Sequence, residues 1–141
     1  MAIIVDTGPL FALANEADYY HAVVRKYLST SRDTLLVPFP VVTETCIVLL
    51  DRLGSEAESS FLRSLARKEI HVEQVSDVDL VRIIEILEQY RDAKFGMVDA
   101  ATMAMAERLK VEMILTLDRR DFSIYRPRHC PRFRLVPEDL R

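Results

Sequence analysis

Four acidic residues lie beside or within apolar segments of this chain, namely Asp6, Glu44, Asp99 and Asp118. A carboxylate in apolar surroundings is costly unless something compensates its charge. Carboxylates that converge repel one another and raise each other's pKa values, unless a divalent cation neutralises them. All-oxygen ligands without His or Cys suit Mg²⁺ or Mn²⁺, and these ions bind phosphates and activate water for attack on a phosphodiester. If the fold brings the four acids together, they predict a metal-dependent site of this chemistry.

Each of these acids also has a structural explanation that involves no chemistry. Asp6 could cap the helix after it, Asp99 could stabilise the first turn of its helix, and Asp118 could close a turn. Glu44 lies in V-V-T-E-T-C-I-V-L-L, where the residues three and four positions away are all non-basic. It could reach solvent at a helix edge or pair with a distant arginine. The convergence of the acids is what would distinguish a functional site from these roles.

The first nine residues, M-A-I-I-V-D-T-G-P, predict how Asp6 is positioned. The β-branched run 3–5 is typical of a strand that is buried on both faces of a parallel sheet. Thr7, Gly8 and Pro9 are turn and helix-start residues, so the chain leaves the sheet immediately after Asp6. Ligands of open α/β sheets bind at this edge, beyond the carboxyl ends of the strands.

Apolar runs and helical periodicity alternate along the rest of the chain. The expected strands are 3–5, 35–37, 71–75, 113–117 and 133–136, and the expected helices are 10–14, 18–31, 41–53, 55–68, 76–90 and 98–110, with a polar loop at 91–96. This alternation predicts a parallel α/β sheet with right-handed crossovers in the strand order 3-2-1-4-5. The first and fourth strands then lie side by side. Asp6 and Asp118 would share one edge of the sheet, and acids on two helices could reach it.

Composition and length predict one cytoplasmic domain that covers residues 1–141. The amino terminus lacks the regions of a signal peptide, and no apolar run approaches the roughly 20 residues that span a bilayer. The net charge of −3 does not indicate a generally basic, nucleic-acid-binding protein. The two cysteines and three histidines follow no zinc-binding spacing. We therefore expect reduced thiols and no zinc site.

Four stretches of the sequence resemble the PIN-domain ribonucleases, and their spacing is similar to that of the VapC toxins of bacterial and archaeal toxin–antitoxin pairs. They are I-I-V-D-T-G-P-L, V-V-T-E-T, G-M-V-D-A-A and I-L-T-L-D-R-R-D-F, which follow one another in order along the chain. The resemblance implies a PIN-like three-layer α/β/α sandwich around a central parallel sheet of four to five strands.

The resemblance also implies which residues form the site. The residues that match the family's acidic metal-binding set are Asp6, Glu44, Asp99 and Asp118. Thr7 and Thr116 match hydroxyl positions near the metal. The role of Asp121 stays open, because it could act as an additional acid or cap the short helix that begins there. Met97 stands where relatives more often have a hydroxyl residue, which alters no ligand.

The implied function is hydrolysis of RNA phosphodiester bonds by one or two Mg²⁺ or Mn²⁺ ions, in the toxin of a type II toxin–antitoxin system. Asp6 and Asp99 would be the central ligands, while Glu44 and Asp118 would hold a second ion or orient water. The implied partners are the RNA substrate, a VapB-type antitoxin and a second copy of the chain in a homodimer, with no membrane. The exposed faces of the helices between 18 and 68 are candidate docking surfaces for the antitoxin.

Positive charge is concentrated in residues 119–134, which hold six arginines and one acid. This segment carries +5, so the rest of the chain carries −8 of the total −3. The segment could steer an RNA backbone toward the acidic site, or it could be an ordinary charged surface.

Two other functions are compatible with parts of this pattern. The chain could be a catalytically silent PIN-fold interaction protein, in which the acids serve only as caps; intact acids at all four positions argue against this. A strand-ending Asp followed by Thr also occurs in phosphatases that form an aspartyl-phosphate. Those enzymes need a second Asp two residues later, where this chain has Gly8.

Overall fold

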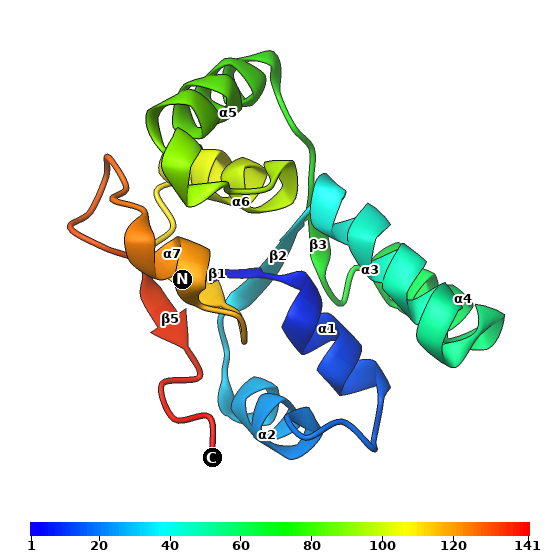
Figure 1. The fold of residues 1–141 in the computed structure, drawn as a ribbon. Helices are drawn as coiled ribbons and strands as arrows, with labels where there is room; N and C mark the ends of the chain where they lie inside the picture. The colour runs from blue at the N-terminus through cyan, green and yellow to red at the C-terminus, as the bar shows by residue number, and fades with distance from the viewer.

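A parallel five-stranded sheet forms the centre of the molecule (Figure 1), and the computed structural model describes all 141 residues. The strands are β1 (Ala2–Val5), β2 (Thr34–Pro38), β3 (His71–Glu73), β4 (Met113–Leu115) and β5 (Arg134–Val136). Their order is β3-β2-β1-β4-β5, and every neighbouring pair is parallel. The predicted strand order is therefore confirmed.

Helices cover both faces of this sheet. They are α1 (Thr7–Ala14), α2 (His21–Thr30), α3 (Phe39–Leu53), α4 (Ser55–Ala66), α5 (Asp77–Gln89), the 3₁₀ turn η1 (Arg91–Ala93), α6 (Met97–Leu109) and α7 (Arg120–Ile124). Helices α1 to α4 share one hydrophobic core with the sheet, and α5 to α7 share the other (Figure 1). The result is the predicted three-layer arrangement. None of the helices combines the length and apolar character needed to cross a membrane.

The first strand contributes to both cores, as its unbroken apolar sequence predicts. Ile3 and Val5 belong to the core under α1, α3 and α4, whereas Ile4 belongs to the core under α5 and α6. All three are almost completely buried because β1 has β2 on one side and β4 on the other. The Asp6 N–H continues the ladder by donating to the Leu115 carbonyl at 3.0 Å. The backbone of Asp6 is thereby fixed at the carboxyl edge of the sheet.

Helix α6 is packed in the interior because most of its side chains are small. Seven consecutive residues, 100–106, are buried. Four of them are alanines, which let the helix approach both the sheet and α5 closely. Asp99 lies in the first turn of this helix, so its position is set by an element that is held on several sides.

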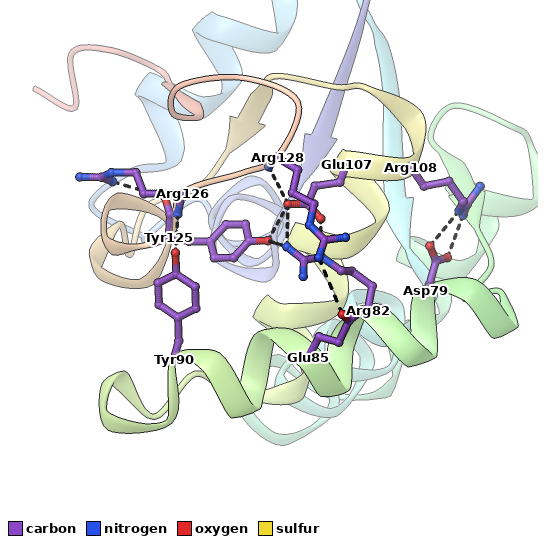
Figure 2. A network of polar contacts seen from close by, with 9 residues as sticks. All are labelled: Asp79, Arg82, Glu85, Tyr90, Glu107, Arg108, Tyr125, Arg126 and Arg128. Carbon is purple, nitrogen blue, oxygen red and sulfur yellow. Dashed lines mark hydrogen bonds and ion pairs between the residues drawn. The ribbon is translucent and has the colours of Figure 1, made fainter.

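Polar contacts fix α5 against α6 and against the chain that follows α7, as Figure 2 shows. Arg108 makes two hydrogen bonds to Asp79, from Nε at 2.8 Å and from Nη2 at 3.0 Å. Arg82 donates from Nε to Glu107 at 2.8 Å and from Nη2 to the Tyr125 hydroxyl at 3.0 Å. Tyr125 in turn donates to Glu107 at 2.6 Å. This network joins three segments that lie far apart in the sequence.

Two expected strands are shorter than predicted. The strand expected at 71–75 ends at Glu73, because its partner β2 ends at Pro38 in the same register and offers nothing further to pair with. The strand expected at 113–117 ends at Leu115. After it the chain leaves the sheet in a turn, in which the Thr116 hydroxyl oxygen lies 3.1 Å from the Asp118 carbonyl oxygen.

Several helical segments also differ from the prediction: α1 begins at Thr7 rather than at residue 10, and α4 ends at Ala66 rather than at residue 68. Helix α3 begins at Phe39, before the expected residue 41, because Pro40 is well placed in a first turn, where its missing N–H leaves no bond unmade. Helix α2 begins at His21 rather than at residue 18, since residues 16–20 form turns. The expected loop 91–96 contains the 3₁₀ turn η1, which ends at Lys94 in the left-handed conformation.

Candidate active site

The four predicted acids line a single pocket at the carboxyl edge of the sheet. The pocket has a volume of about 390 Å³, and its lining residues are Asp6, Thr7, Gly8, Phe11, Glu44, Val48, Arg52, Gly96, Met97, Val98, Asp99 and Asp118. These residues come from the end of β1, from α1, α3 and α6, and from the turn after β4. The carboxylates that are far apart in the sequence therefore face one space.

Asp6 is the most deeply buried of these acids, with 8% of its surface exposed. Its carboxylate accepts a hydrogen bond from the Thr116 hydroxyl at 2.9 Å. Although Asp6 is the N-cap residue of α1, its side chain makes no capping hydrogen bond to that helix. Burial raises the pKa of Asp6, the Thr7 N–H and the Thr116 hydroxyl lower it, and the charges of Glu44 and Asp118 raise it further. The net pKa of Asp6 is raised, which means that the fold destabilises its ionised form. Helix capping does not explain why an acid occupies this position, because the side chain makes no capping hydrogen bond.

The pKa of Asp99 is also raised. Burial, a hydrogen bond to the Asp121 carboxyl group and the charges of Asp6, Asp121 and Glu44 raise the pKa of Asp99 to about 8. At neutral pH the Asp99 carboxyl group is therefore largely protonated. Burial is the largest cause of this shift, and the neighbouring carboxylates add to it.

Asp121 lies beside the site rather than at the cap of α7. The N-cap residue of α7 is Arg119, and Asp121 is in the first turn of the helix. Its carboxylate contacts Asp99 on one side and accepts from Arg120 Nη1 at 2.6 Å on the other. Asp121 does not line the pocket, and the two roles that the sequence left open for it both stay predictions.

Glu44 and Asp118 face the pocket with few polar partners of their own. Glu44 is half-buried on α3 and forms no ion pair with any arginine or lysine, which removes the pairing that could have explained it. Asp118 is exposed, and its side chain accepts one long hydrogen bond, at 3.4 Å, from the Arg120 N–H. Both carboxylates keep oxygen atoms that no protein group occupies.

The chemistry of this pocket fits a hard divalent cation. Its ligand atoms are carboxylate and hydroxyl oxygens, and the Thr7 hydroxyl is a buried polar atom without a hydrogen-bond partner. Burial is the main cause of the raised pKa values of Asp6 and Asp99, and repulsion by the other acids adds to it; a cation would relieve that repulsion. No three acidic, imidazole or thiol side chains are arranged around one point as ligands of a single ion. The evidence for a cation site is therefore the oxygen ligands that line the pocket and the Thr7 hydroxyl without a hydrogen-bond partner.

Two residues of the pocket were missed from the sequence, Arg52 and Phe11. The Arg52 guanidinium carbon lies 5.5 Å from the centroid of the Phe11 ring. Arg52 lies four residues after Val48 and eight after Glu44, so a helix places the three on one face. This spacing could have predicted that Arg52 lines the pocket. No sequence feature predicts the same of Phe11, because its apolar helix indicates only a position in the core.

The arginine-rich segment 119–134 uses much of its charge within the molecule. Arg119 donates to the carbonyls of Thr116 and Pro137, and Arg120 to Asp121 and the Ala93 carbonyl. The remaining contacts are those of Arg126 with backbone carbonyls, Arg128 with Glu85 and Arg134 with Glu138. None of these arginines lines the acidic pocket. The steering of RNA by this segment stays a prediction.

Both cysteines are free thiols, as expected.

Comparison with known proteins places this geometry in a family. The PIN domain model matches residues 3–126. Ribonuclease VapC26 of Mycobacterium tuberculosis is 35% identical over 135 residues, which cover 96% of this chain and all of that protein.

Two solved structures share the fold. The crystal structure of Mycobacterium tuberculosis VapC20, a toxin that cleaves the sarcin–ricin loop, superimposes with a TM-score of 0.80 at 21% identity and covers 87% of this chain and 95% of that one. VapBC2 of Rickettsia felis, bound to a DNA fragment from its promoter, gives a TM-score of 0.67 at 16% identity and covers 96% of this chain and 97% of that one. The family match extends from β1 to the turn after α7 and includes every acid of the pocket, and on this evidence the chain belongs to the PIN-domain family.

Proposed function

We propose that this chain is a metal-dependent ribonuclease that hydrolyses RNA phosphodiester bonds and acts as the toxin of a type II toxin–antitoxin pair. The observation that carries this proposal is the convergence of four carboxylates on one pocket. Contact with Asp121 helps to raise the pKa of one of them, Asp99. The similarity to Ribonuclease VapC26 over nearly the whole chain supports the choice of RNA as the substrate.

The catalytic residues are Asp6, Glu44, Asp99 and Asp118. A bound Mg²⁺ or Mn²⁺ supplies Lewis-acid activation of water and neutralises charge on the phosphate. Asp6 and Asp99 are the central ligands, while Glu44 and Asp118 hold a second ion or orient the attacking water. Thr116 fixes the Asp6 carboxylate through its 2.9 Å hydrogen bond, and Thr7 offers a free hydroxyl beside it. Contact with Asp121 helps to raise the pKa of Asp99, and a bound cation would favour the ionised form of Asp99.

The proposed partners are an RNA, a VapB-type antitoxin and a second copy of the chain, within the cytoplasm, with residues 1–141 acting as one domain. Two exposed apolar surfaces support protein partners. Ile47 and Leu50 on α3 and Leu62 on α4 are 63%, 49% and 45% exposed. Val78 and Val81 on α5 are 72% and 61% exposed. The first surface lies among the helices expected to receive the antitoxin, and the second is available for the homodimer.

Thermal unfolding of the wild type and of Asp6→Asn, each in EDTA and in Mn²⁺, tests the metal site without knowledge of the RNA. In EDTA we expect Asp6→Asn to raise the Tm, because the buried carboxylate no longer carries a charge beside Glu44 and Asp118. Mn²⁺ should raise the Tm of the wild type more than that of the variant. The matched control is Asp92→Asn, which removes an exposed acid without an ion pair. A Tm that Mn²⁺ leaves unchanged, with Asp6→Asn destabilising, would favour the silent interaction protein instead.

The raised pKa of Asp99 predicts that stability in EDTA falls as the pH rises. The pKa of Asp99 is about 8 in the folded protein, against an ordinary value of 3.8. Between these values the folded state binds more protons than the unfolded state, so the free energy of unfolding decreases with increasing pH. We expect Tm in EDTA to fall over this range, and Asp99→Asn to flatten the fall. If the pH dependence of Tm is the same for the wild type and Asp99→Asn, the pKa of Asp99 is not raised in the folded protein.

A further inference from the structure

The acidic pocket contains one cationic side chain, that of Arg52. Arg52 is exposed near the end of α3, and it forms no ion pair with any carboxylate of the molecule. An arginine beside several acids would ordinarily pair with one of them and neutralise it. Here the guanidinium group keeps its charge and its donors available.

The Phe11 ring explains why Arg52 stays apart from the acids. Phe11 projects from α1 into the same pocket, and the guanidinium carbon of Arg52 lies 5.5 Å from its centroid. A guanidinium group over an aromatic face is attracted to the ring electrons and loses part of its conformational freedom. Phe11 is half-buried and fixed by the core beneath it. The arginine is therefore held at the rim by a residue that does not consume its hydrogen-bonding groups.

The position of Arg52 along α3 separates it from the centre of the site. Arg52 follows Glu44 by eight residues, which corresponds to a rise of about 12 Å along the helix axis. Val48 lies between them on the same face and contributes no charge. A group at this distance does not meet the same phosphate as the carboxylates at the opposite end of the pocket.

We propose that Arg52 binds a backbone phosphate of the RNA strand that flanks the bond to be cleaved, with Phe11 as the residue that positions its guanidinium group. This inference rests on the proposed ribonuclease function. An anionic strand is repelled by a pocket of carboxylates, so a fixed cation at the rim would supply attraction where the strand enters. A planar guanidinium group is suited to two parallel hydrogen bonds with a phosphate.

The test is the affinity of the protein for a fluorescein-labelled single-stranded RNA of randomised sequence, measured by anisotropy over a range of salt concentrations. All proteins carry Asp6→Asn and are kept in EDTA, so that the RNA is not cleaved. Arg52→Gln should weaken binding about tenfold, as expected for the loss of a charged hydrogen bond. It should also lower the slope of log affinity against log salt by about 0.7, the value for one phosphate contact on a single strand.

Two further variants separate the charge from its positioning. Arg52→Lys should keep the salt slope and lose part of the affinity, because the charge remains but the planar donor pair does not. Phe11→Leu should weaken binding about threefold with the slope preserved, since leucine fills the space without an aromatic face. Arg25→Gln is the matched control; Arg25 is an exposed arginine on α2 outside the pocket, and its loss removes the same charge.

The possible results distinguish this inference from the function on which it rests. If Arg52→Gln and Arg25→Gln have equal affinity and equal salt slopes, Arg52 only packs α3 against α1 and the inference is wrong. That result leaves the ribonuclease proposal standing as long as the wild type cleaves RNA in Mn²⁺. If the wild type neither binds nor cleaves RNA, the proposed function fails, and the role of Arg52 fails with it.

Discussion

Asp99→Asn is expected to lower the rate of metal-dependent RNA cleavage by about 10³-fold, equivalent to about 4 kcal/mol of transition-state stabilisation. The substitution replaces a charged ligand by a neutral amide of the same shape, so the protein should remain folded. At neutral pH, folding requires Asp99 to take up a proton, because its pKa rises from 3.8 to about 8, whereas Asn is neutral in both states. We therefore expect the loss of activity together with a higher Tm in EDTA at neutral pH. Cleavage of total cellular RNA in Mn²⁺, followed by sequencing of the new ends, provides the readout.

The control for this variant is again Asp92→Asn, which changes the same functional group seven residues earlier in η1. Asp92 is exposed and does not line the acidic pocket. Cleavage by Asp92→Asn should equal that of the wild type. Residual cleavage by Asp99→Asn within a few-fold of the wild type would contradict the assignment of Asp99 as a central ligand. Because thermal unfolding is recorded on the same samples, a misfolded variant is recognised by its lower Tm.

The acids that could be predicted from sequence are those whose positions follow from local rules. Asp6 ends a buried strand, and the alternation of strands and helices places Asp118 at the same edge. Glu44 is anomalous within its own helix, because the residues three and four positions away from it are apolar. For each of these residues a short stretch of sequence contains the information.

The residues that sequence reasoning missed or left open depend on contacts between distant segments. Asp121 approaches Asp99 across 22 positions of the sequence, because α7 packs next to α6. Arg52 meets Phe11 across 41 positions, because α3 lies next to α1. The residue periodicity of a single helix or strand does not predict contacts of this kind between two elements. The lengths of β3 and β4 were also overestimated, since a strand ends where its neighbour stops pairing.

A polar network distant from the pocket is expected to control the stability of the fold. Glu107→Ala should lower the free energy of unfolding by about 3–5 kcal/mol, because it leaves the Arg82 guanidinium group without its carboxylate partner. The Glu107 and Arg82 side chains are only 8% and 12% exposed, so water compensates only a part of the lost contact. Burial raises the pKa of Glu107, but hydrogen bonds from Arg82, Tyr125 and the Arg128 N–H outweigh it, and the net pKa is lowered. The ionised carboxylate is therefore the form that the fold stabilises.

Glu85→Ala is the matched control, because Glu85 also pairs with an arginine but does so at the surface (Figure 2). Its contact with Arg128 spans 3.7 Å, with the side chains 50% and 63% exposed. This pair should contribute less than about 1 kcal/mol. Equal destabilisation by Glu107→Ala and Glu85→Ala would show that burial does not strengthen the inner contact.

Thermal and urea unfolding would measure this difference directly. For a chain of this length, the expected loss in Glu107→Ala corresponds to a decrease in Tm of about 10–20 °C. Tyr125→Phe should cost about 1–2 kcal/mol, since it removes one donor and leaves Arg82 and Glu107 together. The network joins α5, α6 and the chain after α7, and α6 and α7 carry Asp99 and Asp121. Loosening it should therefore also reduce the effect of Asp121 on the pKa of Asp99, so that Tm in EDTA falls less steeply with pH in Glu107→Ala than in the wild type.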